Sequence, residues 1–209
     1  MEKKKEDLKC CVTSCDKPLD ENYWEAQWQS KTTGWDIGYA SPAIVQYMQQ
    51  YPNKNASLLI PGCGNAYEAE QLVKMGFTNI TLIDIAPKAV EQLKKKFENI
   101  PQVKILHADF FNHQGKYDLM IEQTFFCAIP PNKRKEYAQK ASELLNSKGK
   151  IIGLLFDKTF ETDGPPFGGC PCEYKPIFNP YFEIKTMELC TNSIPPRVNS
   201  EVFIIFDKK

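Results

Sequence analysis

The chain has 209 residues, 42% of them hydrophobic and 25% charged, a balance typical of one globular domain with a full apolar core. Basic and acidic residues number 26 each, so the composition indicates no basic surface for nucleic acid or for an anionic membrane. No apolar run approaches the roughly 20 residues that span a bilayer, and the charged N-terminus is unlike a signal peptide. We therefore expect a cytoplasmic monomer that acts on a small molecule, without nucleic-acid or membrane partners.

The eight cysteines are expected to be free thiols, because the chain is large for a disulfide-stabilised domain and shows no secretion signal. Five of them form two clusters, and these are Cys10, Cys11, Cys15, Cys170 and Cys172. A zinc site shared by the two clusters is an alternative. The spacings match no common zinc pattern and no histidine stands nearby, so we predict no metal.

Residues 1–20 are lysine-rich and aperiodic, and we expect a loose tail ahead of a single domain at residues 21–209. The three tryptophans, Trp24, Trp28 and Trp35, then precede the first predicted strand. The spacing of Trp24 and Trp28 puts both indoles on one face of a helix. Such a helix either packs on the core or covers a ligand. Three tryptophans together favour a lid over residues 21–50, which includes a second predicted helix at residues 42–50.

Short apolar runs and amphipathic helices alternate through the rest of the chain. We predict strands at residues 57–60, 80–85, 104–107, 117–122 and 150–156, and helices at residues 66–75, 87–99 and 132–146. This alternation predicts an α/β, Rossmann-like domain with a mostly parallel sheet and helices on both faces. Residues 182–189 and 202–206 have the pattern of a C-terminal antiparallel hairpin, joined across Pro195-Pro196.

Glycines and an acid stand where the first two predicted strands end, the edge at which α/β sheets bind ligands. The first strand runs into Gly62-Cys-Gly64, a turn that lets the backbone approach a ligand where a Cβ would clash. Asp84, followed by Ile85, lies 20 residues after Gly64. An acid at that position accepts hydrogen bonds from ribose hydroxyls, so the pattern predicts a nucleoside site.

The next strand ends distinguish between cofactors. Asp109-Phe110 suits an adenine amine and ring face, and Glu122-Gln123 adds polar groups after the fourth strand. Ala66 takes the place of the third glycine of a dinucleotide site, and no basic residue stands near it to meet a pyrophosphate. Acids and indoles suit a cation instead, since a sulfonium against an aromatic face gains about 0.5–2 kcal/mol. We predict S-adenosylmethionine, which joins adenosine to a sulfonium.

Several motifs resemble the thiopurine S-methyltransferase superfamily, and in particular its plant-type thiol/halide methyltransferase branch. They are Trp24-x-x-x-Trp28, Gly34-Trp35-Asp36-x-Gly38, Ile60-Pro-Gly-Cys-Gly64, Asp84, Asp109-Phe-Phe111, Phe125-Phe-Cys-Ala-Ile129 and Asp163-Gly-Pro-Pro-Phe167, and the likeness runs from about residue 20 to the end. The resemblance implies a class I methyltransferase fold with seven strands, one of them antiparallel. It also implies a lid that closes over the methyl donor and donor contacts from Trp24, Trp28, Trp35, Gly62, Asp84, Asp109, Phe110 and Gln123.

Two positions depart from the pattern. Ile60 stands where the common methyltransferase glycine motif has an acid, two residues before its first glycine. Gln123 stands where the thiol/halide branch often has tyrosine, and this leaves the choice of methyl acceptor open.

The implied reaction is in-line transfer of a methyl group to a thiol, hydrosulfide, thiocyanate or halide. A thiol has a pKa of about 8.5, so no strong general base is needed, and His107 and His113 are interpreted as structural. Catalysis then depends on positioning and on a dry acceptor pocket. Candidates for the pocket wall are Phe125, Phe126, Phe156, Pro166 and Phe167.

Two alternatives stay open: a thiopurine-like or metalloid-detoxifying methyltransferase with a broader pocket, and a non-catalytic S-adenosylmethionine-binding module. An NAD-dependent oxidoreductase is disfavoured by the missing third glycine. A nucleic-acid methyltransferase is disfavoured as well, because it requires a basic face and usually an Asn/Asp-Pro-Pro-Tyr/Phe motif after the fourth strand. At that place the chain reads Glu122-Gln-Thr-Phe125.

Overall fold

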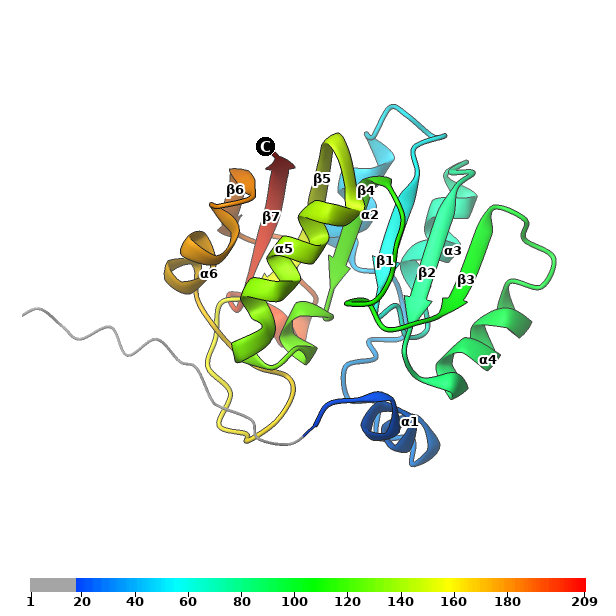
Figure 1. Ribbon diagram of the computed structural model, residues 1–209, viewed down its shortest axis with the longest axis horizontal. Coiled ribbons are helices and arrows are strands. Elements are labelled where there is room, and N and C mark those ends of the chain that lie inside the picture. Colours follow the sequence, from blue (N-terminus) through cyan, green and yellow to red (C-terminus); the bar gives the residue numbers. More distant parts are fainter. Residues whose placement is uncertain (1–17) are drawn as a thin grey trace, which may run out of the picture.

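A computed structural model describes residues 18–209. Within them, seven strands form one sheet in the order β3-β2-β1-β4-β5-β7-β6 (Figure 1). The strands are β1 Leu58–Pro61, β2 Ile80–Asp84, β3 Val103–His107, β4 Tyr117–Gln123, β5 Leu145–Phe156, β6 Phe182–Leu189 and β7 Glu201–Lys208. Strands β1 to β5 run parallel, whereas β7 is antiparallel to both β5 and β6. The predicted mostly parallel sheet with a C-terminal antiparallel hairpin is confirmed.

Helices cover both faces of this sheet. They are α1 Glu21–Gln29, α2 Pro42–Gln49, α3 Tyr67–Lys74, α4 Pro87–Lys96, α5 Arg134–Leu144 and α6 Pro171–Phe178. Helices α5 and α6 lie on one face, and α2, α3 and α4 contribute to the apolar layer on the other (Figure 1). Among residues 18–209, no helix combines the length and apolarity that crossing a membrane requires.

Strand β1 shows how one run of apolar residues serves both faces. Leu59 packs into the layer beneath α5 and α6, whereas Leu58 and Ile60 pack into the layer beneath α2, α3 and α4. Successive side chains of a strand point to opposite faces, so a strand buried on both sides must be continuously apolar. The same burial extends to Pro61, where the strand ends at the glycine turn.

The topology places a crevice at the carboxyl end of β1. The chain moves outward from β1 to β2 and β3 and then crosses back to β4, on the other side of β1. Ligands in open α/β sheets bind at such a switch in strand order. Helix α1 and the loop after it lie beyond the carboxyl ends of the parallel strands (Figure 1). The N-terminal segment is therefore placed over the crevice.

Two element assignments from the sequence were wrong. Helix α6 was not predicted, because Pro171 and Pro176 interrupt the helical pattern; it is held by the buried side chains of Tyr174 and Phe178. The helix predicted to reach residue 146 ends at Leu144, and β5 begins at once. Leu145 is fully buried and pairs with Tyr117 of β4, so tertiary packing overrides the local helical pattern.

The prediction of free thiols was wrong for one pair. Cys170 and Cys172 form a disulfide at the start of α6, and their Cα atoms are 5.3 Å apart. Cys63, Cys127 and Cys190 carry free thiols, as predicted. Cys10, Cys11 and Cys15 lie outside the described residues.

Candidate active site

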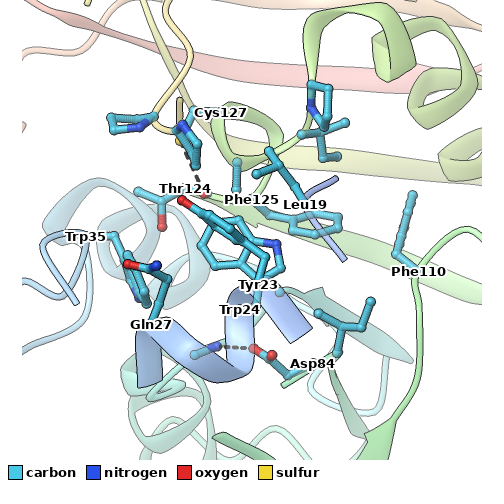
Figure 2. A pocket seen from close by; sticks show the side chains of 18 of the residues that line it. Leu19, Tyr23, Trp24, Gln27, Trp35, Asp84, Phe110, Thr124, Phe125 and Cys127 are labelled. Atoms are coloured by element: carbon cyan, nitrogen blue, oxygen red, sulfur yellow. Dashed lines mark hydrogen bonds between the residues drawn. The ribbon is translucent and has the colours of Figure 1, made fainter. Parts of the chain in front are cut away.

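A cavity of about 1060 Å³ opens at the carboxyl ends of the strands, beneath α1. Most of the predicted donor-site residues line it: Trp24, Trp28, Trp35, Gly62, Gly64, Asp84, Ile85, Asp109 and Phe110. In Figure 2, side chains of α1 such as Tyr23 and Trp24 face Thr124 and Phe125 across this space. Residues far apart in the sequence therefore converge on one cavity.

The glycine turn forms one wall of the cavity. Gly62 and Gly64 have φ angles of +54° and +51°, in the left-handed region that favours glycine. A Cβ on Gly62 would lie 2.9 Å from Phe125 Cγ and would overlap with the rest of that ring. The missing side chain therefore allows the Phe125 ring to rest on the turn.

Asp84 braces the same turn from the end of β2. Its Oδ2 accepts a hydrogen bond from Gly64 N at 2.9 Å, and its Oδ1 accepts one from Ala86 N at 2.9 Å. Burial raises the pKa of this carboxyl, against the effect of the backbone N–H groups of Ala86, Gly64 and Ile85. Each carboxylate oxygen keeps a second lone pair, so Asp84 can still accept bonds from a ligand in the cavity.

The three indoles form a cluster with two roles. Trp35 lies between the others, with ring centroids 5.6 Å from Trp24 and 6.0 Å from Trp28. Trp28 is buried against Ala86 and Ala89 at the start of α4, whereas Trp24 and Trp35 are only partly buried. Trp28 thus anchors the helix to the fold, and the cluster as a whole supplies an aromatic cavity wall.

Hydrogen bonds attach the N-terminal segment to the main body. Lys88 N, in the first turn of α4, donates to Glu25 Oε2 at 2.8 Å and thereby satisfies a backbone group that the helix leaves unpaired. Asp36 Oδ2, in the loop after α1, accepts from Asn65 Nδ2 at 2.6 Å. Arg197 Nη2 donates to the Trp35 carbonyl at 3.3 Å. The segment is closed over the cavity by contacts to three separate parts of the chain.

At the end of β4, the side chains of Glu122 and Gln123 face different places. Glu122 does not line the cavity, since its carboxylate turns inward and accepts from the N–H groups of Phe125 and Phe126, both at 2.8 Å. Gln123 faces a smaller pocket of about 50 Å³ beside the glycine turn. Its Oε1 is buried there without a hydrogen-bond partner in the described structure. Thr124 follows with a φ of +58°, an unusual conformation for a β-branched residue and a sign of a functional turn.

Three of the five residues predicted for the acceptor wall line the cavity. Phe125, Phe156 and Pro166 line the cavity, whereas Phe126 and Phe167 are 1% exposed and belong to the core. Phe126 packs on Tyr137 and Tyr174 in T-shaped contacts. The rings of Phe126 and Phe167 therefore support the cavity wall from behind and do not form its surface.

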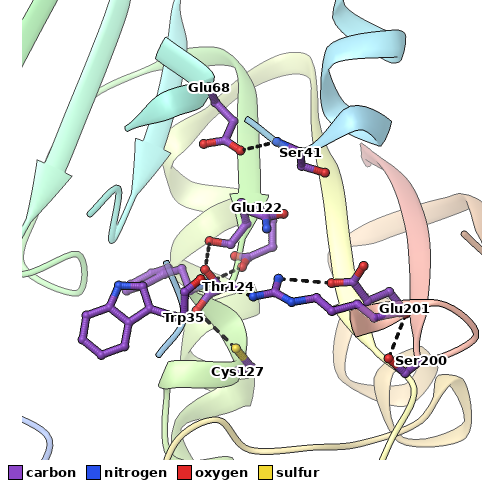
Figure 3. Close-up of polar contacts among 11 residues, drawn as sticks. Trp35, Ser41, Glu68, Glu122, Thr124, Cys127, Ser200 and Glu201 are labelled. Atoms are coloured by element: carbon purple, nitrogen blue, oxygen red, sulfur yellow. Dashed lines mark hydrogen bonds and ion pairs between the residues drawn. The ribbon is translucent and has the colours of Figure 1, made fainter. Parts of the chain in front are cut away.

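Two cations at the ends of β5 and β7, Lys158 and Arg197, line the cavity without having been predicted. Lys158 Nζ lies over the Phe160 ring at 5.2 Å, and the Arg197 guanidinium lies over the Phe156 ring at 5.3 Å. Arg197 Nη1 also pairs with Glu201 Oε1 at 3.3 Å (Figure 3). The Pro195-Pro196 sequence before Arg197 forms a short 3-10 helix, Pro195–Arg197, which presents the guanidinium to the cavity.

The charges of the cavity are separated by the strand order. Asp84 and Asp109 stand at the ends of β2 and β3, and Lys158 and Arg197 stand at the ends of β5 and β7. Strands β1 and β4 lie between the two pairs. A third cation, Lys133, lies over the Phe111 ring at 5.0 Å, on the acidic side. The cavity therefore has one half lined by two acids, the indoles and Lys133, and a cationic half lined by Lys158 and by Arg197, whose charge is partly offset by Glu201.

Free thiols and histidines do not provide a nucleophile or base here. Burial raises the pKa of Cys127 to about 12, and its Sγ donates to the Thr124 carbonyl at 3.2 Å (Figure 3). Burial also raises the pKa of Cys63. His107 lies near the Ile85 carbonyl and Glu21, and His113 bonds Tyr117. Neither histidine lines the cavity.

Comparisons with known proteins agree with this site. The family model for thiopurine S-methyltransferase (TPMT) matches residues 19–205. The chain belongs to the thiopurine S-methyltransferase family. It is 33% identical over 162 residues to the probable thiol methyltransferase 2 of Arabidopsis thaliana, covering 75% of this chain and 71% of that protein. It is 28% identical over 189 residues to the thiocyanate methyltransferase 1 of Brassica oleracea, covering 88% and 83%.

Membership of the thiopurine S-methyltransferase family makes the chain an S-adenosylmethionine-dependent S-methyltransferase. The fold agrees with class I methyltransferases. Magnesium protoporphyrin IX methyltransferase from Synechocystis PCC 6803, solved with bound SAH, superposes with a TM-score of 0.72 at 15% identity, covering 90% of this chain and 97% of that chain. The predicted family, fold and cofactor are confirmed.

Glu122 gives this thiopurine S-methyltransferase family member a testable pH dependence. Tyr137 OH donates to its Oε2 at 2.6 Å, and burial raises its pKa from 4.5 to about 7. A carboxyl whose pKa is higher in the folded state stabilises the fold at low pH. That contribution is lost as pH rises from about 4.5 to about 7, by about 3 kcal/mol at most.

We expect Glu122→Gln, which does not titrate, to gain stability relative to the native protein between pH 5 and pH 8. The glutamine oxygen still accepts the two backbone N–H groups, and its amide can donate to Tyr137. Urea unfolding of both proteins at the two pH values measures the difference. An equal difference at pH 5 and pH 8 would show that Glu122 stays ionised in the folded protein.

Proposed function

We propose that the acidic, indole-lined half of the cavity holds the methyl donor and that the cationic half holds a small anionic acceptor. This assignment rests on the positions of the charged residues along the edge of the sheet, with acids at the ends of β2 and β3 and cations at the ends of β5 and β7. When bound, S-adenosylmethionine supplies a methyl group on a positively charged sulfur. Acids and aromatic faces stabilise such a cation, whereas Lys158 and Arg197 would repel it.

The donor half offers a partner for each part of an S-adenosylmethionine molecule. Asp84 accepts from the ribose hydroxyls through its remaining lone pairs, and Asp109-Phe110 meets the adenine. The unpartnered Gln123 Oε1 beside the glycine turn accepts from the donor's ammonium group. The Trp24, Trp28 and Trp35 cluster covers the sulfonium. A buried acceptor without a partner lowers the stability of the fold, so the position of Gln123 Oε1 favours a ligand with N–H groups at this point.

The acceptor half suits thiolates, hydrosulfide, thiocyanate or halides. Arg197 and Lys158 attract an anion and bring it toward the donor half. Phe125, Phe156 and Pro166 exclude water, which raises the reactivity of a soft anion. The nucleophile arrives charged or nearly so, so the site needs no residue to remove a proton. The similarity to a probable thiol methyltransferase and to a thiocyanate methyltransferase of plants supports this acceptor class.

The test is a panel of acceptors with labelled methyl donor: hydrosulfide, an aliphatic thiol, an aromatic thiol, thiocyanate and iodide. We expect label in the small anions and thiols. Faster transfer to the aromatic thiol than to any small anion would favour the thiopurine-like alternative. Tight donor binding with label in none of the acceptors would favour the non-catalytic module.

A second arm of this experiment tests the cationic half. Lys158→Gln should raise KM for anionic acceptors about two- to fivefold at low salt, since an exposed charge contributes about 0.2–1 kcal/mol. Donor affinity should not change, and the difference should shrink as salt screens the charge. Lys148→Gln, an exposed lysine at the opposite end of β5, is the matched control. An equal KM in the two variants would contradict the assignment.

A cytoplasmic location, a monomeric state and a role in detoxification remain predictions from composition and resemblance. The sequence predicts a tail at residues 1–20 and a domain at residues 21–209. We propose to move the start of the domain to residue 18 or earlier. Pro18, Leu19 and Asp20 line the cavity, and Asp20 caps α1 by accepting from Tyr23 N at 3.0 Å. The functional domain therefore begins by residue 18.

A further inference from the structure

The Cys170–Cys172 disulfide is a chemically reactive group that the methyl-transfer site does not use. Only Pro171 separates the two cysteines, and neither lines the cavity. Cys172 is exposed and Cys170 is partly exposed, so a small thiol in solution can reach the bond. Exposed disulfides are the ones that exchange with thiols, whereas buried disulfides are protected.

The disulfide adjoins the segment that forms much of the acceptor wall. We call residues 157–169, between β5 and α6, the strap. Four of its residues line the cavity, and they are Lys158, Phe160, Pro165 and Pro166. Lys158 and Gly169 close the base of the strap with two backbone bonds, N to O at 3.1 Å and 3.0 Å. The disulfide begins at the residue directly after this pair.

The end of the strap is packed without free space. Phe167 N donates to the carbonyl of Cys127, a cavity-lining residue, at 2.7 Å, and Arg134 Nη2 donates to the Gly168 carbonyl at 2.8 Å. A Cβ on Gly168 would overlap with the Lys158 carbonyl. A change of conformation at Cys170 would therefore act on the Lys158–Gly169 pair directly before it.

The position of helix α6 is fixed by contacts that do not involve the disulfide. Its Tyr174 is buried and donates from OH to the Phe156 carbonyl at 2.6 Å, and its Phe178 packs on Phe206 with ring centroids 4.7 Å apart. The helix thus stays in place when the disulfide opens. Opening the disulfide would therefore free Cys170, the residue that joins the helix to the strap.

The position at a helix start also favours opening by a thiolate. Cys170 is the N-cap of α6 and Cys172 lies in its first turn. Attack of a thiolate on the exposed Cys172 sulfur forms a mixed disulfide, breaks the Cys170–Cys172 bond and releases Cys170 as a thiolate. The helix N-terminus stabilises that leaving thiolate. A second thiolate then releases Cys172, so two thiols are oxidised to one disulfide and the two protons pass to the cysteines.

We propose that the Cys170–Cys172 pair is a thiol-reactive site that controls the strap, opened by small thiols of the same class as the methyl acceptor. The identity of the thiol rests on the proposed function. In the oxidised protein the strap is held and the acceptor wall is complete. In the reduced protein the strap loosens, so acceptor binding weakens while the donor half, at the ends of β2 and β3, is unaffected.

The chemical step is tested without the methyl donor. The native protein is incubated with an aliphatic thiol, alkylated with iodoacetamide and digested, and the peptide with both cysteines is analysed by mass spectrometry. We expect two alkyl groups on this peptide after thiol treatment and none before it. Alkylation before treatment, or no alkylation after it, would overturn the proposal.

The effect on the strap is tested by trypsin cleavage at Lys158 under native conditions, in oxidised and in phosphine-reduced protein. We expect reduction to speed cleavage at least fivefold, because cleavage follows the population of open conformations. The Cys170→Ser/Cys172→Ser variant should be cleaved rapidly in both conditions. Cys190→Ala, a buried cysteine in a separate cluster, should behave like the native protein. Equal cleavage rates in the oxidised and reduced native protein would overturn the proposal.

Kinetics complete the test with thiocyanate, an acceptor that does not reduce disulfides. Reduction and the double serine variant should both raise its KM three- to tenfold and leave donor affinity unchanged. An unchanged KM would contradict control of the acceptor wall. If no acceptor is methylated, the proposed function fails, and the alkylation and cleavage results still decide whether the thiol-reactive site exists.

Discussion

Gly62→Ala should lower kcat/KM for methyl transfer about a hundredfold while the protein remains folded. Alanine at a φ of +54° costs about 1–2 kcal/mol, since the left-handed region is unfavourable for any residue with a Cβ. The new methyl group would also displace the Phe125 ring that rests on Gly62. That ring can move only into the cavity or against the core beneath it. The backbone cost lowers stability, whereas the displaced ring accounts for the loss of activity, and a hundredfold loss corresponds to roughly 2.7 kcal/mol of transition-state stabilisation.

Gly76→Ala separates the backbone cost from the clash. Gly76 has a φ of +88°, and a Cβ there meets nothing within 4 Å. We expect both variants to lose unfolding free energy, measured by urea denaturation, and Gly62→Ala to lose more because of the clash; methyl transfer should stay within twofold of native in Gly76→Ala. Calorimetric titration with S-adenosylmethionine shows whether the loss in Gly62→Ala arises at donor binding. Equal activity of the two variants would mean that the Phe125 contact is not needed.

The strand-end residues could be predicted because parallel strands end at one edge of the sheet. Gly62, Gly64, Asp84 and Asp109 follow three consecutive strands, so their place at the cavity needed only the alternation of strands and helices. Glu122 has the same position relative to β4 but faces inward. Neighbouring strand residues point to opposite sides, and a single apolar run does not reveal which of Glu122 and Gln123 faces the ligand.

The cationic half of the cavity could be predicted only in part. Lys158 follows β5 by two residues, as Asp109 follows β3, so the strand-end rule covers it although it was overlooked; Arg197 lies in a turn before the last strand, and its position does not follow from a periodic pattern. Arg197 reaches the cavity because the antiparallel β7 inserts between β5 and β6, and only the complete sheet shows this. Helix α6 was missed for a related reason, since its stability comes from buried aromatic rings and not from helical propensity.

Asp84→Asn should weaken S-adenosylmethionine binding ten- to a hundredfold and lower the unfolding free energy by about 1–3 kcal/mol. Both oxygens of Asp84 accept backbone N–H groups, from Gly64 and from Ala86. Asparagine has a single acceptor oxygen, so its amide nitrogen must face one of these donors and leave it unpaired. The glycine turn then loses its brace, and in the proposed donor site a ribose hydroxyl loses a charged acceptor. Both the loosened turn and the missing charge weaken donor binding.

Asp118→Asn is the matched control, because Asp118 accepts hydrogen bonds on both oxygens but lies away from the cavity. Its Oδ2 accepts from Ser57 N at 2.9 Å, and its Oδ1 accepts from Asn146 Nδ2 at 2.7 Å. We expect Asp118→Asn to lose stability by the same mechanism and to bind S-adenosylmethionine like the native protein. Calorimetric titration and urea denaturation of both variants separate the two effects. If Asp84→Asn loses stability but binds the donor with native affinity, Asp84 only braces the turn, and the ribose contact must be assigned to another group.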